Sequence, residues 1–243
     1  MSGEDKYAYL DAIIEDEKYD AFDAAIEDND SEALERLIQE NPEVVHKEDH
    51  LGQTPLITAC ILGYIDMVKI LITHGAIINH QAEDGGTALH TAVFQGDFEI
   101  VEYLIEQGAD VNIEQHDGRT PLLMASRNRL DIVELLVTHG ANVNHQNKTG
   151  YTALFTATLE GKPHIVEYLI IQGANVNART TSGDTALICA SRRNKNKSHE
   201  FIFQLLLLAD ADITLLNNNG NSAMNYAQKN NHSYLGDQYV PHW

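Results

Sequence analysis

The sequence predicts an all-α solenoid of about six to seven stacked helix–turn–helix units with hairpin loops between them. A first set of evenly spaced residues is a threonine that recurs after 33, 33, 32 and 33 residues, at Thr54, Thr87, Thr120, Thr152 and Thr185. A second set is a glycine that recurs after 33, 32 and 33 residues, at Gly75, Gly108, Gly140 and Gly173. Self-similarity at a fixed period of this length indicates an array of repeated supersecondary units, none of which can bury its own apolar face.

Each threonine begins a short apolar segment, such as TPLITA at Thr54 and TALHTA at Thr87, which predicts the first helix of a unit. Threonine is a good N-cap, and Pro55 and Pro121 occupy the first helical position, where a missing N–H costs nothing. A leucine two residues after each threonine and an alanine five residues after it are expected to point inward. These residues are Leu56, Leu89, Leu122, Leu154, Leu187, Ala59, Ala92, Ala125, Ala157 and Ala190.

Each recurring glycine closes a second apolar segment, such as MVKILITHGA, which predicts the second helix of a unit. Its buried face is expected at i, i+3 spacing, and the glycine supplies the left-handed residue that ends the helix. The predicted buried residues are Val68, Leu71, Val101, Leu104, Val133, Leu136, Val166 and Leu169. An asparagine-rich polar segment then leads to another glycine, as in a hairpin turn, at Gly85, Gly118, Gly150 and Gly183.

A period near 33 residues, with Thr-Pro-Leu-His-type and Gly-Ala-Asp-type signatures, resembles the ankyrin repeat. The resemblance covers about residues 16–235. We expect acidic N-terminal helices and a capping repeat in residues 1–48, five ankyrin repeats in 49–216, and a C-terminal capping half repeat and tail in 217–243. Residues 1–15 are expected to add one acidic helix and residues 236–243 an extended tail. The unit that begins at Thr185 gains about four residues in RRNKNKSHE, and Asp210 replaces its closing glycine.

The charge of the chain is large and unevenly distributed. Of 243 residues, 43% are apolar, and 16 basic side chains stand against 36 acidic ones, a formal net charge of −20. This composition supports a core, but it argues against a protein that grips a phosphate backbone over its whole surface. Residues 1–116 hold 26 acidic and 5 basic side chains, whereas residues 117–243 hold 10 and 11. The acidic half either serves solubility or steers a basic partner.

The sequence favours a cytoplasmic location. The two cysteines, Cys60 and Cys189, provide no disulfide framework, which is typical of a reducing compartment. The first residues, MSGEDKYAYL, do not resemble a signal peptide, although a leader already removed would leave no trace. The longest apolar stretch, near Leu205–Leu208, is far shorter than a membrane span, so no membrane partner is expected.

No catalytic motif is present: the chain lacks the P-loop, GxGxxG, HExxH, GxSxG, CxxC and EF-hand patterns. The sequence therefore predicts no enzyme, no cofactor and no metal site. The histidines recur because the repeat recurs; His74 and His139 precede closing glycines, where a cation suits a helix C-terminus. Cys60 and Cys189 are expected to be buried, inert thiols.

The resemblance implies that a partner binds the concave face, which hairpin tips and first-helix surfaces form. Counting from the threonines gives candidate partner-binding residues at Ile61, Leu62, Phe94, Gln95, Arg119, Arg127, Asn128, Tyr151, Leu159, Arg192 and Arg193. Five of these are apolar or aromatic, which either marks an interaction surface or reflects packing against the next repeat. The basic residues either form a solvated loop or face an anionic partner; they are Arg119, Arg127, Arg129, Arg192, Arg193, Lys195 and Lys197.

These observations predict a non-catalytic protein–protein interaction module, an adaptor or scaffold. The charge distribution predicts a protein partner with a basic end toward the N-terminal half and an acidic end toward the C-terminal half. An inhibitor of the self-protection or immunity type, which occludes the active site of a partner enzyme, is the alternative. A cryptic enzyme or a binder of an anionic ligand is a weaker alternative, and nucleic acid is the least favoured partner.

Overall fold

The computed structural model of the chain describes residues 21–193 and 197–229. The helix expected in residues 1–15 and the tail expected in residues 236–243 lie outside the described residues. All regular structure in the described ranges is helical, with no β-strand. The chain forms two compact units, which meet between Asp110 and Val111; we call them unit 1 (residues 1–110) and unit 2 (residues 111–243).

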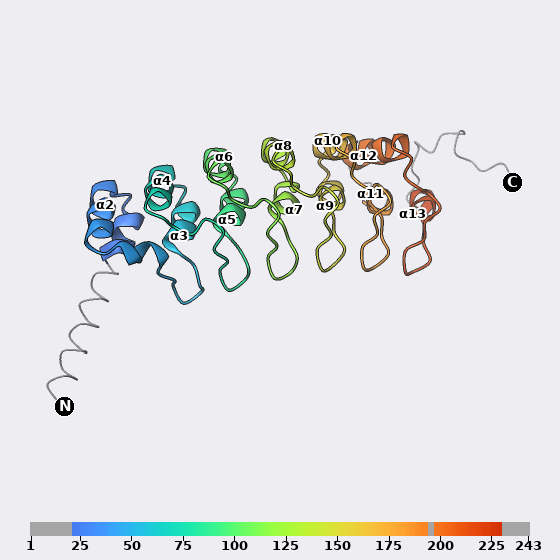
Figure 1. The fold of residues 1–243 in the computed structure, drawn as a ribbon. Helices are drawn as coiled ribbons and strands as arrows, with labels where there is room; N and C mark the ends of the chain where they lie inside the picture. The colour runs from blue at the N-terminus through green and yellow to red at the C-terminus, as the bar shows by residue number, and fades with distance from the viewer. Residues whose placement is uncertain (1–20, 194–196, 230–243) are drawn as a thin grey trace, which may run out of the picture. The chain divides into compact units, whose positions relative to one another are not determined.

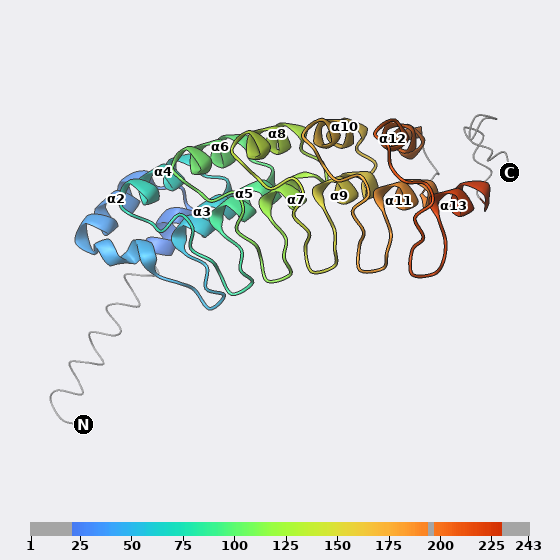
Figure 2. The same ribbon diagram turned by 45° about the vertical axis from the view of Figure 1, so that its right-hand side comes forward.

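Unit 1 contains pairs of antiparallel helices that follow the predicted repeat. Residues 21–27 are helical. The elements that follow are α2 (Ser31–Glu40), the short 3-10 helix η1 (Pro42–His46), α3 (Pro55–Leu62), α4 (Ile65–Thr73), α5 (Ala88–Gln95) and α6 (Phe98–Glu106). The first helices α3 and α5 pack side by side, as do the second helices α4 and α6, and the hairpin loops extend from the row of first helices (Figures 1 and 2).

Unit 2 repeats this arrangement. Its first helices are α7 (Pro121–Ala125), α9 (Ala153–Leu159), α11 (Ala186–Arg192) and α13 (Ala223–Lys229). Its second helices are α8 (Leu130–Thr138), α10 (Pro163–Ile171) and α12 (Lys197–Leu208). Each first helix packs against the next first helix, and the hairpins again extend from that row (Figure 2).

The predicted starts of the first helices and the predicted left-handed residues after the second helices are confirmed. The hydroxyl oxygens of Thr87, Thr120, Thr152 and Thr185 each accept a hydrogen bond from the backbone N–H three residues later. Thr54 is an exception, because its buried Oγ1 makes no capping hydrogen bond. At the other end of a second helix, Asp210 adopts a left-handed φ of 59° where the other repeats have glycine. This residue thus ends α12 as the sequence predicts.

The predicted core is confirmed in both units. Every leucine, alanine and valine that the repeat pattern places inward is at most 1% exposed. Alanine at the fifth position after each threonine leaves room for neighbouring first helices to approach closely. The buried faces of the helices therefore join from one repeat to the next, which an isolated repeat could not achieve.

Backbone hydrogen bonds also join successive hairpins. In each case a backbone N–H of one hairpin donates to a carbonyl of the preceding hairpin at 3.0–3.1 Å. These bonds run from Glu83 to Leu51 in unit 1, and from Lys148 to Asp117, Thr181 to Thr149 and Asn218 to Ser182 in unit 2. The hairpins consequently form a hydrogen-bonded row that presents their tips on one side of each unit.

Candidate functional site

The histidines of the repeats bond to the backbone, as the repeat pattern predicts. Nδ1 of His74 lies 2.9 Å from the carbonyl of Ile70, and Nδ1 of His139 lies 2.8 Å from that of Leu135. His90 closes a capping box with Thr87 at the start of α5. Over residues 21–193 and 197–229, no group of three or more His, Cys, Asp or Glu side chains is placed to hold a metal ion.

The two cysteines are buried free thiols. Burial raises the pKa of Cys60 far above its ordinary value, and the negative charge of Asp97 raises it further. Burial likewise raises the pKa of Cys189 to about 11, although the nearby charges of Arg192 and Arg193 oppose the shift. A thiol that stays protonated at neutral pH is a poor nucleophile and a poor metal ligand, so neither side chain offers covalent chemistry.

In unit 1, four candidate residues come together where two first helices end. Ile61 and Leu62 finish α3, and Phe94 and Gln95 finish α5, which packs against it. The side-chain amide of Gln95 donates a 2.7 Å hydrogen bond to the Ile61 carbonyl and so ties the two helix ends together. Ile61, Leu62 and Phe94 are 40%, 37% and 74% exposed. We call these four residues the α3–α5 patch.

The sequence leaves open whether the apolar candidates are exposed or pack against the next repeat, and the 74% exposure of Phe94 decides this for Phe94. An aromatic ring with three quarters of its surface in water does not pack into the neighbouring repeat of unit 1. Soluble proteins expose single apolar residues often, but adjacent ones gathered at one place are typical of interaction surfaces. The α3–α5 patch thus has the composition of a docking surface.

In unit 2, the corresponding positions are more polar and are engaged with their neighbours. Asn128 accepts a 2.7 Å hydrogen bond from Nζ of Lys162. The guanidinium of Arg127 lies 3.5 Å from the carboxylate of Glu160, and Leu159 is half-buried at the end of α9. The structure therefore places these three candidates on one side of unit 2, but it leaves little apolar surface there.

The hairpin candidates of unit 2 are also engaged. Arg119 pairs with Asp117 of its own hairpin at 2.6 Å. Tyr151 is half-buried, and its ring stacks obliquely on Phe155 with a centroid distance of 4.6 Å. Arg129, which lies between α7 and α8 and not in a hairpin, makes a two-pronged contact with Asp131. These hydrogen bonds lower the pKa of the Asp131 carboxyl below its usual value.

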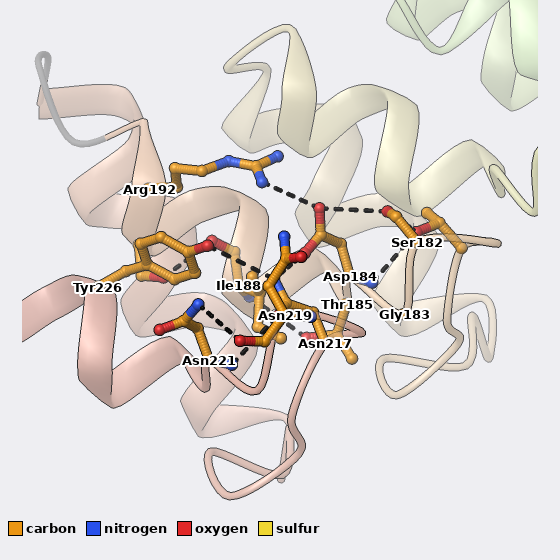
Figure 3. A network of polar contacts seen from close by, with 12 residues as sticks. Ser182, Gly183, Asp184, Thr185, Ile188, Arg192, Asn217, Asn219, Asn221 and Tyr226 are labelled. Carbon is orange, nitrogen blue, oxygen red and sulfur yellow. Dashed lines mark hydrogen bonds and ion pairs between the residues drawn. The ribbon is translucent and has the colours of Figure 1, made fainter.

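Arg192 belongs to a polar network that anchors the last described helix (Figure 3). Its guanidinium donates to the Asp184 carboxylate at 3.0 Å and lies over the Tyr226 ring of α13, 5.9 Å from the centroid. The Asp184 side chain is only 7% exposed, and the amide of Asn217 donates to it at 2.7 Å. Arg192 and its neighbour Arg193, the C-cap of α11, are both exposed, but the contacts with Asp184 and Tyr226 give Arg192 a structural role. Lys195 lies outside the described residues.

An acidic hollow in unit 1 was not apparent from the sequence. It is an open depression beside α3 with a volume of about 340 Å³. The residues that line it include Asp23, Glu27, Lys47, Glu48, Asp49 and Ile61. In the sequence, Asp23, Glu27 and Glu48 belong to the expected capping repeat and Asp49 begins the next repeat, and the acidic charge of this half is left open between solubility and a basic partner. Only packing brings these acidic residues beside Ile61.

The fold and the exposed first-helix ends define the class of protein. A family model described as "Ankyrin repeats (3 copies)" matches residues 22–115, 110–180 and 165–235, so the chain belongs to the ankyrin repeat family. The predicted family and the predicted ankyrin solenoid are thereby confirmed. No curated protein matches the sequence. Across the part of the chain that the structure describes, no helix has both the length and the apolar character needed to cross a bilayer.

Among solved structures, this chain is similar to the crystal structure of the ankyrin repeat domain of Bcl-3, which is described as a unique member of the IkappaB protein family. The TM-score is 0.75 and the sequence identity is 28%. The alignment covers 85% of this chain and 93% of that one. The ankyrin architecture thus extends over most of the chain, and ankyrin repeats generally mediate protein–protein interaction.

Proposed function

We propose that this protein is a non-catalytic interaction module, an adaptor or scaffold, that binds a partner protein on the face formed by first helices and hairpin tips. The observation that carries the proposal is the α3–α5 patch, with Phe94 at 74% exposure beside two further exposed apolar side chains. Aromatic residues at the centre of an interface supply much of its binding energy. The buried thiols and the backbone-bonded histidines support a role without catalysis.

The structure gives more support to a basic partner segment on unit 1 than to an acidic partner segment on unit 2. The excess of acidic side chains in residues 1–116 favours a basic segment on unit 1. In unit 2, Arg119, Arg127, Arg129 and Arg192 each lie within 4.0 Å of a carboxylate of the same unit. Since these charges are already locally compensated, they give less support to an acidic partner segment. We also place the protein in the cytoplasm, which suits two cysteines that are both free.

The test is to capture partners from native lysate, crosslink them, and measure the affinity of the captured partner for variants. Phe94→Ala and Tyr151→Ala are each expected to cost about 1–3 kcal/mol of binding free energy, because aromatic side chains dominate interfaces. Ile171→Ala is the matched control, since Ile171 is 72% exposed but ends a second helix. Crosslinks confined to second helices, together with unchanged affinity for Phe94→Ala and Tyr151→Ala, would contradict the proposal. If the partner is an enzyme, its activity in the complex separates the inhibitor alternative from a scaffold.

A further inference from the structure

The α3–α5 patch is continuous with the acidic hollow of unit 1. Ile61 belongs to both: it is exposed at the end of α3, and its side chain also lines the hollow. Pro55, at the first turn of α3, lines the hollow as well. The two features therefore form one surface, in which an acidic depression passes into an exposed apolar area.

The described residues that line the hollow include more acidic than basic side chains. Asp23, Glu27, Glu48 and Asp49 contribute four carboxylates to its walls, and Lys47 contributes one ammonium group. Asp49 has a structural task, because its Oδ1 accepts hydrogen bonds from the backbone N–H groups of Leu51 and Gln53, both at 2.8 Å. The Glu48 side chain is 54% exposed and lies 3.7 Å from Nε2 of His80. The formal excess of three negative charges favours a cationic occupant.

Lysine and arginine side chains fit both the charge and the walls of the hollow. Their aliphatic stems pack on apolar surface while the charged head remains among polar groups, so Ile61 and Pro55 suit the stem and the carboxylates suit the head. An apolar side chain next to that cation in a partner would then reach the exposed surface of Leu62 and Phe94.

We propose that unit 1 binds a short segment of a partner protein in which a lysine or arginine stands next to an aliphatic or aromatic residue, with the cation in the hollow and the apolar side chain on the α3–α5 patch. This inference rests on the proposed function and specifies its partner. A second copy of this chain is disfavoured as the occupant by the formal net charge of −20 that both copies would carry. The same repulsion disfavours an acidic peptide, a nucleic acid or an anionic membrane.

The probe is a displayed library of random 12-residue peptides, selected against the full chain. Selected peptides are expected to be enriched in Lys or Arg adjacent to Leu, Ile or Phe. The best peptide is then synthesised with a fluorophore, and its Kd is measured by anisotropy. The double variant Glu27→Gln with Glu48→Gln is expected to weaken binding about tenfold, since charge complementarity is lost without loss of volume. Phe94→Ala is expected to weaken it about 5- to 100-fold.

The matched control is Glu102→Gln with Glu106→Gln, which removes the same charge from exposed positions of the second helix α6. This control is expected to change Kd less than twofold at physiological salt, since screening limits distant charges. Circular dichroism of each variant shows whether the fold is retained. Raising the salt concentration is expected to weaken binding to the parent protein more than binding to the Glu27→Gln, Glu48→Gln variant.

Other outcomes contradict the inference in different ways. Peptides that lack basic residues, and whose binding depends on Phe94 but not on Glu27 or Glu48, overturn the cationic segment and leave the proposed function standing. Peptides insensitive to every substitution on this face count against both. If sedimentation velocity shows a dimer of the parent protein and Phe94→Ala abolishes it, the α3–α5 patch serves self-association and the inference is overturned. A library that yields no enriched peptide also overturns it, while the proposed function is judged by its crosslinked partner.

Discussion

Gly150 and Gly140 offer a pair of substitutions that separates backbone strain from crowding between hairpins. Both lie in unit 2, and their φ angles are +77° and +88°. A β-carbon on Gly140 would have nothing within 4 Å. A β-carbon on Gly150 would lie 2.8 Å from Cα of Thr180 and 2.9 Å from the backbone nitrogen of Thr181, in the next hairpin. Only the second substitution therefore forces two hairpins apart.

The expected losses of stability follow from these contacts. Alanine in the left-handed region costs about 1–2 kcal/mol, which is the whole cost expected for Gly140→Ala. Gly150→Ala carries the same strain and a further cost of about 1–3 kcal/mol for overpacking against backbone that cannot rotate away. Displacing Thr181 also stretches its 3.0 Å hydrogen bond to the carbonyl of Thr149, which links the two hairpins. Gly150→Ala is thus expected to be the more destabilising by about 1–3 kcal/mol.

Urea unfolding followed by far-UV circular dichroism measures both variants against the parent protein. Because repeat arrays can unfold in parts, the whole curves are compared, and hydrogen exchange of the Thr181 amide reports the local effect. Faster exchange at Thr181 is expected in Gly150→Ala but not in Gly140→Ala. Equal loss of stability in the two variants, with no change at Thr181, would refute the reasoning that close hairpin packing stabilises unit 2.

Two further predictions concern buried polar groups of unit 2. Arg192→Ala is expected to lower the free energy of unfolding by about 1–3 kcal/mol, because it removes the ion-pair partner of a buried carboxylate, a cost reduced by the partial exposure of Arg192. Arg193→Ala is the adjacent control, with an expected effect within about 0.5 kcal/mol, and equal effects of the two would contradict the structural role of Arg192. His199 is 6% exposed, and this burial lowers its pKa below the ordinary 6.5. The charge of Arg193 also lowers the pKa, whereas hydrogen bonds to the carbonyls of Leu159 and Thr158 raise it. The unfolded chain then binds the proton more readily, so stability is expected to fall as the pH drops below about 6.5. Urea midpoints at about pH 7.5 and 5.5 are expected to differ more in the parent than in His199→Gln, and parallel shifts would argue against this linkage.

The helices and the core were predictable because the same residue pattern occurs in several successive repeats. A leucine such as Leu89, two residues after a threonine that caps a helix, faces the core in every repeat, and the structure buries all of them. The left-handed Asp210 could be recognised in the same way, since it occupies the position of a closing glycine. Departures from the pattern were less predictable. Thr54 has the sequence of an N-cap yet makes no capping hydrogen bond, and nothing in the structure explains the difference.

The candidate surface was predicted only in part. Counting from the threonines placed Phe94 on an exposed helix end, where it lies. The same counting treated Arg192 and Arg193 alike, but only Arg192 reaches Asp184 and the Tyr226 ring, because α13 supplies that ring from more than thirty residues away. Contacts of this kind depend on the packing of the next repeat, which the spacing within one repeat does not encode.

The sequence by itself determined the ankyrin family, the positions of the helices and hairpins, and the buried face of each helix, because these follow from local propensity and from a repeated period. Tertiary structure alone decided which surface groups remain available for a partner. It paired Arg127 with Glu160, tied Gln95 to Ile61, and gathered Glu27 and Glu48 around a hollow beside an exposed apolar patch. The physical reason is that electrostatic and hydrogen-bond partners are chosen by distance in space, and stacking brings together residues that are far apart along the chain.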